Sequence, residues 1–290
     1  MKTTIIAEVG ECFNGSMDIA KKMISTAKSA GCDIVKFQLI DMEEVAPDDP
    51  EYEWFASLDL APPKIDRILQ WCCEEKISPL FTPVSVKTAN WLIDAGIDTV
   101  KIASSFVGKK ELIDYVNDNF DVVFASTGMA SLEEIDRLIG CLSKVREISL
   151  LHCISEYPTG PLLELRGLRA LDEKDAHLNM MMILKERYPD LYVGYSDHTD
   201  DIFVPVVAAA MGADIIEKHF TLDRATPVKH YNEGLKYLGT DHVLSIEPEK
   251  LKKMVELIRR VDLIKGDYCW ERSSGERVLI DFLRGRYRER

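Results

Sequence analysis

YVGYSDHTDDIFVPVVAAAMGADIIEKHFT, residues 192–221, is the stretch that decides the fold of this chain. It begins with a strand pattern at residues 192–196, continues with an apolar helical pattern at 202–211 and ends with a second strand pattern at 214–220. Strand, helix and strand in this order are typical of a βαβ unit, whose two strands lie parallel in one sheet. We therefore predict that the ends of these two strands lie next to each other.

The same alternation runs through the rest of the chain and predicts a single (β/α)8 barrel, the TIM-barrel fold of the α/β class. One barrel typically takes about 250 residues, and the chain has 290. We expect a catalytic barrel over residues 1–266 and an extension over 267–290 that forms no second domain.

The expected elements follow from the apolar periodicity and from the turn residues between the segments. A polar, proline-rich stretch at 41–63 is expected to be a long functional loop. The expected strands are residues 3–10, 33–40, 79–83, 99–105, 122–128, 147–154, 192–196 and 214–220. The expected helices are residues 17–30, 64–76, 86–95, 109–119, one that begins after Ser131, a long helical region ending at 188, 202–211 and 248–265.

Composition excludes several classes of partner. The formal net charge of −13 argues against nucleic acid or an anionic membrane as the main partner. No apolar run approaches the roughly 20 residues that a membrane helix needs, and the first residues do not form a signal peptide. The seven cysteines are odd in number and scattered, which indicates reduced thiols. We expect a cytoplasmic protein without a nucleic-acid or membrane partner.

Polar side chains end nearly every predicted strand. In a TIM barrel the active site lies at the C-terminal ends of the strands, where several strands contribute residues. Convergence of polar groups from eight strands therefore predicts an active site. The groups are Glu8, Lys36 with Gln38, Thr82, Lys101 with Ser104, Ser126 with Thr127, Ser155 with Tyr157, Ser196 with His198, and Glu217 with His219.

Lys36 and Lys101 lie in the middle of apolar strands. A lysine is rarely buried without an anion, so we expect both to hold a phosphate or carboxylate. Two alternatives remain open: a Schiff-base lysine of an aldolase, and a structural ion pair with Glu8 or Glu217. The hydroxyl groups that could donate to the same anion are those of Ser104, Ser126 and Thr127.

His198 and His219 follow neighbouring strands of the predicted barrel. Neighbouring strands lie about 4.8 Å apart, so both imidazoles could bind one divalent ion such as zinc, iron or manganese. Two histidines leave coordination positions open, as a catalytic metal requires. The alternative is a pair of hydrogen-bonded core histidines, but Asp241 and His242 follow soon after and favour the metal site.

Short motifs around the strand ends occur together in one known family. They are IIAEVG (5–10), VKFQ (35–38), FTPVS (81–85), VKIASS (100–105), STGMASLEEI (126–135), LHCISEYPT (151–159), GYSDHT (194–199), EKHFTLDR (217–224) and GTDHVLSIEP (239–248). Together these motifs resemble the sialic acid synthase family, whose members condense phosphoenolpyruvate with an N-acetylated amino sugar. The resemblance covers essentially residues 3–265.

The resemblance implies a carbon–carbon bond-forming transferase whose partners are phosphoenolpyruvate and an aldose acceptor, and whose product is a 2-keto-3-deoxy nonulosonic-type sugar acid. His198 and His219 match metal ligands; the ion is usually Mn²⁺, with Mg²⁺, Co²⁺ or Zn²⁺ as other candidates, and acts as a Lewis acid on the aldehyde. Glu8, Asp241 and Lys101 are the candidate catalytic residues. A homodimer is plausible by the same resemblance. The candidate substrate-binding residues are Lys36, Gln38, Thr82, Ser104, Ser126, Thr127, Ser155, Tyr157 and Ser196.

The chain also departs from the family pattern. Cys12-Phe13 replaces the usual Asn-His, and Phe106 stands where the family has a glutamate. Cys12 is either a thiol beside the metal or a small buried residue. Residues 224–239 are longer than their family counterpart, and we predict that they form a lid. The antifreeze-like domain that usually follows the barrel is expected to be missing.

Two other functions remain open at this point. One is a pyruvate-dependent aldolase or lyase, which would use either a metal or Lys101. The other is a degenerate barrel that binds a ligand without turnover. Retention of both histidines, Asp241 and both lysines counts against the degenerate barrel.

Overall fold

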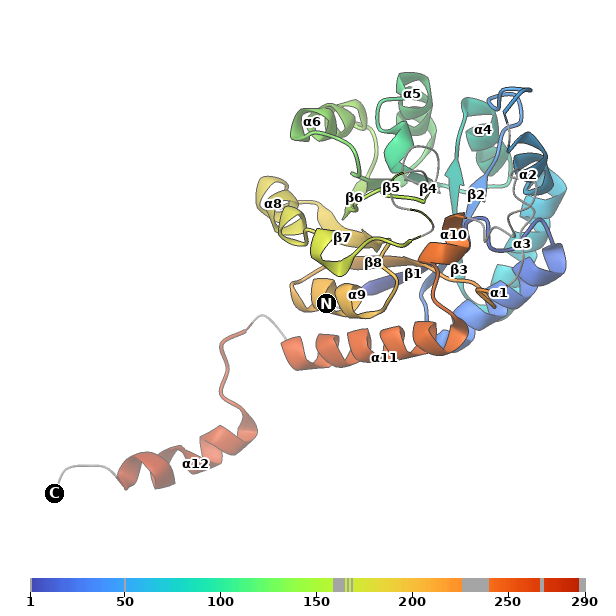
Figure 1. Ribbon diagram of the computed structural model, residues 1–290. Coiled ribbons are helices and arrows are strands. Elements are labelled where there is room, and N and C mark those ends of the chain that lie inside the picture. Colours follow the sequence, from blue (N-terminus) through green and yellow to red (C-terminus); the bar gives the residue numbers. More distant parts are fainter. Residues whose placement is uncertain are drawn as a thin grey trace.

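Eight parallel strands form one nearly closed barrel in the computed structural model, which describes residues 2–49, 51–158, 165, 167, 169–225, 240–266 and 269–286. The strands pair in the order β3-β2-β1-β8-β7-β6-β5-β4, and β3 also contacts β4. Helices surround the barrel, as Figure 1 shows. The predicted TIM barrel is thereby confirmed. The strands are β1 (Thr4–Glu8), β2 (Ile34–Leu39), β3 (Ser78–Pro83), β4 (Thr99–Ile102), β5 (Val122–Ser126), β6 (Glu147–His152), β7 (Tyr192–Asp197) and β8 (Ile215–His219).

The helices begin and end close to the predicted positions. Ser131 forms the expected capping box with Glu134 and starts α6. The helices are α1 (Met17–Ala30), α2 (Tyr52–Ser57), α3 (Pro62–Glu75), α4 (Val86–Asp94), α5 (Lys110–Asn119), α6 (Leu132–Cys141), α8 (Asn179–Arg187), α9 (Phe203–Ala210), α10 (Thr240–Leu244), α11 (Pro248–Lys265) and α12 (Ser274–Gly285), with short 3-10 helices at η1 (Ser104–Phe106) and η2 (Glu173–Asp175).

The barrel interior is apolar at one end and polar at the other. The buried apolar residues form two clusters. The large cluster also contains helix residues, and the small one is separate from it. Because strand side chains alternate between two faces, a residue two positions beyond an interior one also faces inward. Glu8 follows Ile6 in this way, and Glu217 follows Ile215. The small interior cluster consists of Ile6, Leu80, Phe124, Leu151 and Ile215.

Three local predictions were wrong. The stretch 41–63 is not loop throughout: it contains α2, because Trp54 and Leu58 bury their side chains against the barrel. The fourth strand ends at Ile102, and Ser104 already belongs to η1. Within the described residues 169–188, the predicted long helical region consists of η2 and of α8, which is nine residues long.

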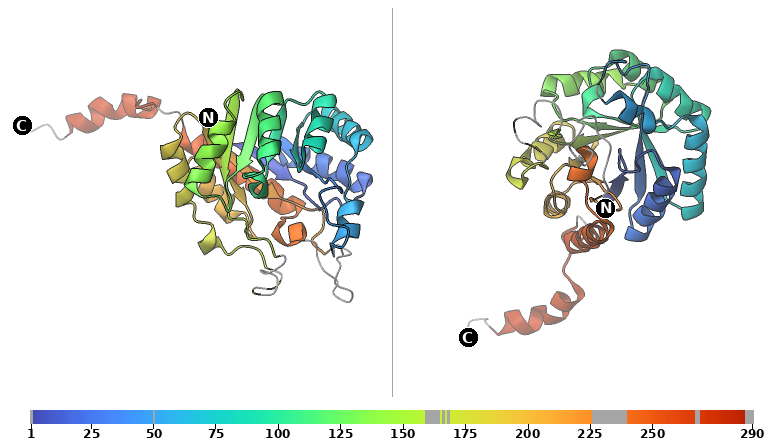
Figure 2. Two further views of the ribbon diagram at one scale, coloured as in Figure 1. Left: turned by 90° about the horizontal axis from the view of Figure 1, so that it is seen from above. Right: turned by 45° about the vertical axis from the view of Figure 1, so that its right-hand side comes forward.

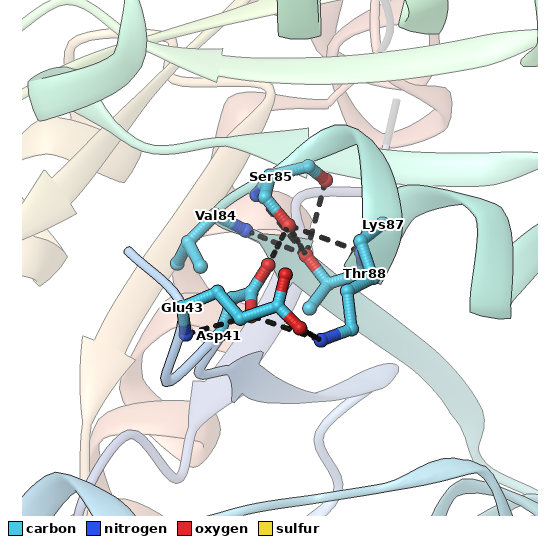
Figure 3. Close-up of polar contacts among 6 residues, drawn as sticks. All are labelled: Asp41, Glu43, Val84, Ser85, Lys87 and Thr88. Carbon is cyan, nitrogen blue, oxygen red and sulfur yellow. Dashed lines mark hydrogen bonds and ion pairs between the residues drawn. The ribbon is translucent and has the colours of Figure 1, made fainter. Parts of the chain in front are cut away.

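The loops after β2 and β3 are joined by the buried side chain of Asp41 (Figure 3). The Ser85 hydroxyl, which caps α4, donates to Asp41 Oδ2 at 2.6 Å. Lys87 Nζ lies 2.7 Å from Glu43 Oε1 and 3.4 Å from Asp41 Oδ1. Thr88 completes the capping box with Ser85. These bonds fix two loops at the rim of the barrel, where the strand ends open.

Helix α12 lies apart from the barrel, beyond the end of α11, in both views of Figure 2. None of its residues is buried. Among the described helices, none is both long enough and apolar enough to cross a membrane.

Candidate active site

The C-terminal strand ends surround a small hollow of about 30 Å³. A larger hollow lies outside the barrel, between α8 and α9, and none of the predicted site residues lines it. The strand-end hollow is the candidate site, because polar groups from β2 to β8 or from the residues that follow them line it. The predicted residues that line it are Lys36, Gln38, Thr82, Lys101, Ser104, Ser126, Tyr157, Ser196, His198 and His219.

The remaining predicted residues lie beside the hollow. Glu8 ends β1 and accepts a hydrogen bond from Gln38 Nε2 at 2.9 Å. Ser155 is hydrogen-bonded to Ser104, with 2.8 Å between the hydroxyl oxygens. The Thr127 hydroxyl donates to the backbone oxygen of Leu151 at 3.4 Å, so Thr127 braces two strands.

Two lysines and two carboxylates form the floor of the site. Lys36 Nζ lies 2.9 Å from Glu8 Oε2 and 2.8 Å from Glu217 Oε2. Lys101 Nζ lies 3.0 and 2.9 Å from the two carboxylate oxygens of Glu217. All four side chains are buried. The ion-pair alternative for both lysines is therefore present in the structure, with Glu217 shared between them.

The pKa of the base Lys36 and the pKa of the acid Glu217 are both lowered on this floor, for different reasons. Burial, opposed by Glu217 and reinforced by Lys101, lowers the pKa of Lys36 to about 7. Burial alone would raise the pKa of Glu217, but the ammonium groups of Lys101 and Lys36 hold that pKa well below its usual range. An incoming anion would meet a lysine pair that already shares one carboxylate, and the ionised Glu217 would compete with it.

The two histidines lie side by side above this floor, with ring centroids 5.5 Å apart. Nδ1 of His198 lies 2.8 Å from the backbone oxygen of Ile154, to which it donates if protonated there. Nε2 of His198 then accepts from the Tyr157 hydroxyl at 3.0 Å. Within the described residues, Nδ1 of His219 has no hydrogen-bond partner and lies 3.7 Å from Asp241 Oδ2.

Burial lowers the pKa of His198 and of His219, and the neighbouring His198 lowers that of His219 further. Both rings are therefore neutral at neutral pH, with lone pairs that a metal can take. Among the described residues, however, no three His, Cys, Asp or Glu side chains are arranged to hold a metal ion by themselves. The residues fit an ion that takes two imidazole ligands and completes its coordination with water or substrate.

Asp241 reaches the site from α10, which follows β8 in sequence. Its Oδ2 accepts from the backbone nitrogen of Glu11 at 2.8 Å. Burial raises the pKa of Asp241 to about 6, against the lowering effects of that hydrogen bond and of Lys36. Gly10 makes room for it: the φ of Gly10 is +49°, and a Cβ there would lie 1.9 Å from Asp241 Oδ2.

Cys12 lies behind Asp241. Its Sγ is 3.3 Å from the hydroxyl oxygen of Ser245 and 3.6 Å from Nδ1 of His242. Burial, followed by the charge of Asp241, raises the pKa of the Cys12 thiol. The contacts of the Cys12 side chain with Ser245 and His242 are therefore those of a neutral, buried thiol. Neither candidate metal ligand is among these contacts.

The sequence reasoning missed some residues that shape the site. Glu217 was named as a strand-end group and as an ion-pair partner but not as a catalytic or binding residue, yet it lines the hollow and bonds both lysines. Its position two residues before His219 on one strand face was the available signal. The predicted lid falls largely on residues 226–239, which lie outside the described residues. Arg224, just before them, pairs with Asp200 at 2.6 Å.

Known proteins match this chain over nearly its whole length. An uncharacterised protein of Methanocaldococcus jannaschii is 37% identical over 95% of this chain and 74% of its own. The N,N'-diacetyllegionaminic acid synthase of Campylobacter jejuni is 31% identical over 98% of this chain and 83% of its own. The crystal structure of the N-acetylneuraminic acid (sialic acid) synthetase of Leptospira borgpetersenii matches with a TM-score of 0.85 and 29% identity, covering 100% of this chain and 94% of that one. The NeuB family model matches residues 23–269. The resemblance to sialic acid synthases is thereby confirmed, and the chain belongs to the NeuB family.

Proposed function

We propose that this protein condenses phosphoenolpyruvate with an aldose, of the N-acetylated amino sugar class, to give a 2-keto-3-deoxy nonulosonic-type sugar acid and phosphate. The observation that carries the proposal is the buried Lys36–Glu217–Lys101 floor beneath His198 and His219. It combines an anion site with a pair of neutral imidazoles. Synthases of diacetyllegionaminic acid and of sialic acid among the relatives support the same reaction class.

Phosphoenolpyruvate would bind at the floor. Its anionic groups would pair with the ammonium groups of Lys36 and Lys101, which face the hollow. The hydroxyl of Thr82 has no partner among the described residues, so it is free to donate to the same anion. Ser104 and Ser126 line the hollow beside it. The floor would thus hold the donor with its reactive carbon towards the histidines.

A divalent ion held by His198 and His219, with Mn²⁺ as the first choice, would act as a Lewis acid on the acceptor's aldehyde. The new bond joins the methylene carbon (C3) of phosphoenolpyruvate to the aldehyde carbon, and the aldehyde oxygen gains a proton. Water adds to the phosphate-bearing carbon (C2), and phosphate leaves with the bridging oxygen, so that C2 becomes the ketone carbon. Asp241, whose pKa is raised to about 6, is mostly ionised at neutral pH and able to accept the proton of that water. Glu8 and Lys101, the other two candidate catalytic residues, would stabilise the charge that develops on the bound donor.

The test is phosphate release from phosphoenolpyruvate across a panel of aldoses, with Mn²⁺, Mg²⁺, Co²⁺ or Zn²⁺ and with a chelator. We expect release with at least one N-acetylated amino sugar, and none in His198→Ala/His219→Ala. Lys110→Met removes an exposed ion pair with Asp114 and is the matched control, with unchanged release. Absence of release with every acceptor and every metal would contradict the proposal.

A pyruvate aldolase is the second candidate, because the pKa of Lys36 is lowered to about 7 and a neutral amine can form a Schiff base. Lys101 is a poorer candidate, since both oxygens of Glu217 bind its ammonium group. Borohydride reduction in the presence of pyruvate would attach a label to lysine only in the aldolase. A homodimer also stays a prediction, and light scattering after size-exclusion chromatography measures it.

A further inference from the structure

A second buried ion pair lies directly beside the two candidate metal ligands. Asp197 and Lys218 are register partners on β7 and β8, and both side chains are fully buried. Lys218 Nζ lies 2.6 Å from Asp197 Oδ2 and also donates to the backbone oxygen of Thr199. The Thr199 hydroxyl donates to Asp197, 2.8 Å from its Oδ2. Three polar groups thus satisfy one another without a substrate.

This pair faces away from the site. Strand side chains alternate between faces, so Lys218 points opposite to Glu217 and His219, both of which line the hollow. Asp197 alternates in the same way with Ser196. Among the described residues, neither member of the pair lines the hollow. Asp197 and Lys218 therefore cannot act on a substrate directly.

The pair holds the backbone on both sides of His198. Asp197 precedes this histidine and Thr199 follows it, and Lys218 binds both. The backbone nitrogen of Leu171 donates to the backbone oxygen of His198 at 3.1 Å. This bond further fixes the peptide group between His198 and Thr199. Since Lys218 also precedes His219 on β8, one ion pair links the backbone positions of both histidines.

We propose that Asp197 and Lys218 are positioning residues that set the separation of His198 and His219 and, through it, the affinity of the site for a divalent ion. The inference rests on the proposed metal site. Burying two ions costs several kcal/mol, and apolar replacements of buried ion pairs are often neutral for stability. The pair therefore adds orientation, which apolar side chains of similar size do not supply.

The experiment replaces both charges at once with Asp197→Leu/Lys218→Met, so that no unpaired charge is left buried. Mn²⁺ affinity is measured on the full chain without substrate, by electron paramagnetic resonance of the free ion, together with the thermal unfolding midpoint and the binding of sulfate at the lysine floor. We expect at least a tenfold weaker Mn²⁺ affinity, a midpoint within a few degrees of the unmodified protein, and unchanged sulfate binding.

The matched control is the ion pair between Lys185 and Asp214, which are 2.7 Å apart. Asp214 also accepts a hydrogen bond from the backbone nitrogen of Val193, at the opposite end of β7 and β8 from the histidines. Lys185→Met/Asp214→Asn should change the midpoint and leave Mn²⁺ affinity unchanged. Thr199→Val removes one hydrogen bond to Asp197 and should weaken Mn²⁺ binding by a few-fold. This variant tests the proposal if the double variant does not fold.

Three results overturn the proposal. One is unchanged Mn²⁺ affinity in both the Asp197/Lys218 and the Thr199 variants, while His198→Ala abolishes binding; the metal site then stands and only the positioning role fails. Another is an equal loss of Mn²⁺ affinity in the control pair. The third is absence of divalent-ion binding in the unmodified protein, which removes the metal site of the proposed function as well.

Discussion

Oε2 of Glu217 lies 2.8 Å from Nζ of Lys36 at the floor of the candidate site, and both side chains are buried. The same carboxylate binds Lys101, so Glu217 is shared by two lysines, while Glu8 pairs with Lys36 alone. Because both lysines share this carboxylate, the stability of the buried lysine pair depends on Glu217 when no anion is bound. An anion that binds the floor therefore meets lysines already paired with Glu8 and Glu217, and it competes with these carboxylates for them.

Glu217→Gln should lower the free energy of unfolding in urea by about 3–5 kcal/mol, because removing one partner leaves buried charge uncompensated. Added inorganic phosphate should recover part of this loss by binding the folded site. Glu44→Gln is the control: it breaks an exposed ion pair with Lys109 and should cost less than about 1 kcal/mol. Equal losses in the two variants would show that the floor is not held by charge.

Anion binding at the floor should weaken as the pH rises above 7. The pKa of Lys36 is lowered to about 7, and only its protonated form attracts an anion. A bound anion raises this pKa, so Kd should be constant below pH 7 and rise by up to about tenfold per pH unit above it. Sulfate keeps its charge over this range and is the probe for calorimetry. Lys36→Arg stays charged and should remove the dependence; the same slope in that variant would assign the titration to another group.

Gly10→Ala should displace Asp241 and destabilise the fold. The added Cβ would lie 1.9 Å from Asp241 Oδ2, at a φ of +49° that disfavours a side chain. Gly96 also has a positive φ, +77°, but an added Cβ there meets no atom of the described chain within 4 Å. Gly96→Ala should therefore cost only the backbone strain, about 1–2 kcal/mol. Urea unfolding should show a larger loss for Gly10→Ala, and phosphate release should fall only in that variant.

Tyr157→Phe should increase the affinity for Mn²⁺ in the absence of substrate. The Tyr157 hydroxyl lies 3.0 Å from Nε2 of His198 and occupies the lone pair that a metal would take. Such a hydrogen bond is worth about 1 kcal/mol, so its loss should tighten Mn²⁺ binding by about fivefold. Tyr115→Phe removes an exposed hydrogen bond to Asn90 and should have no effect. Weaker Mn²⁺ binding in Tyr157→Phe would mean that the hydroxyl helps to hold the ion.

The sequence by itself determined the barrel and the edge on which its polar groups gather. Both follow from local patterns: apolar periodicity distinguishes helix from strand, and parallel strands deliver their C-terminal ends to one rim. His198 and His219 could be placed side by side for this reason, since they end consecutive strands. The resemblance of the motifs also identified the family correctly.

Only the tertiary structure decided which charges meet. Lys101 and Glu217 are 116 residues apart, and their contact depends on strand register and on which side chains reach across the barrel interior. Asp241 meets Glu11 across 230 residues, and α2 forms within a polar stretch because Trp54 finds an apolar surface to bury against. Such pairings leave no periodic trace in the sequence, since they depend on distances that exist only once the strands have closed around a common interior.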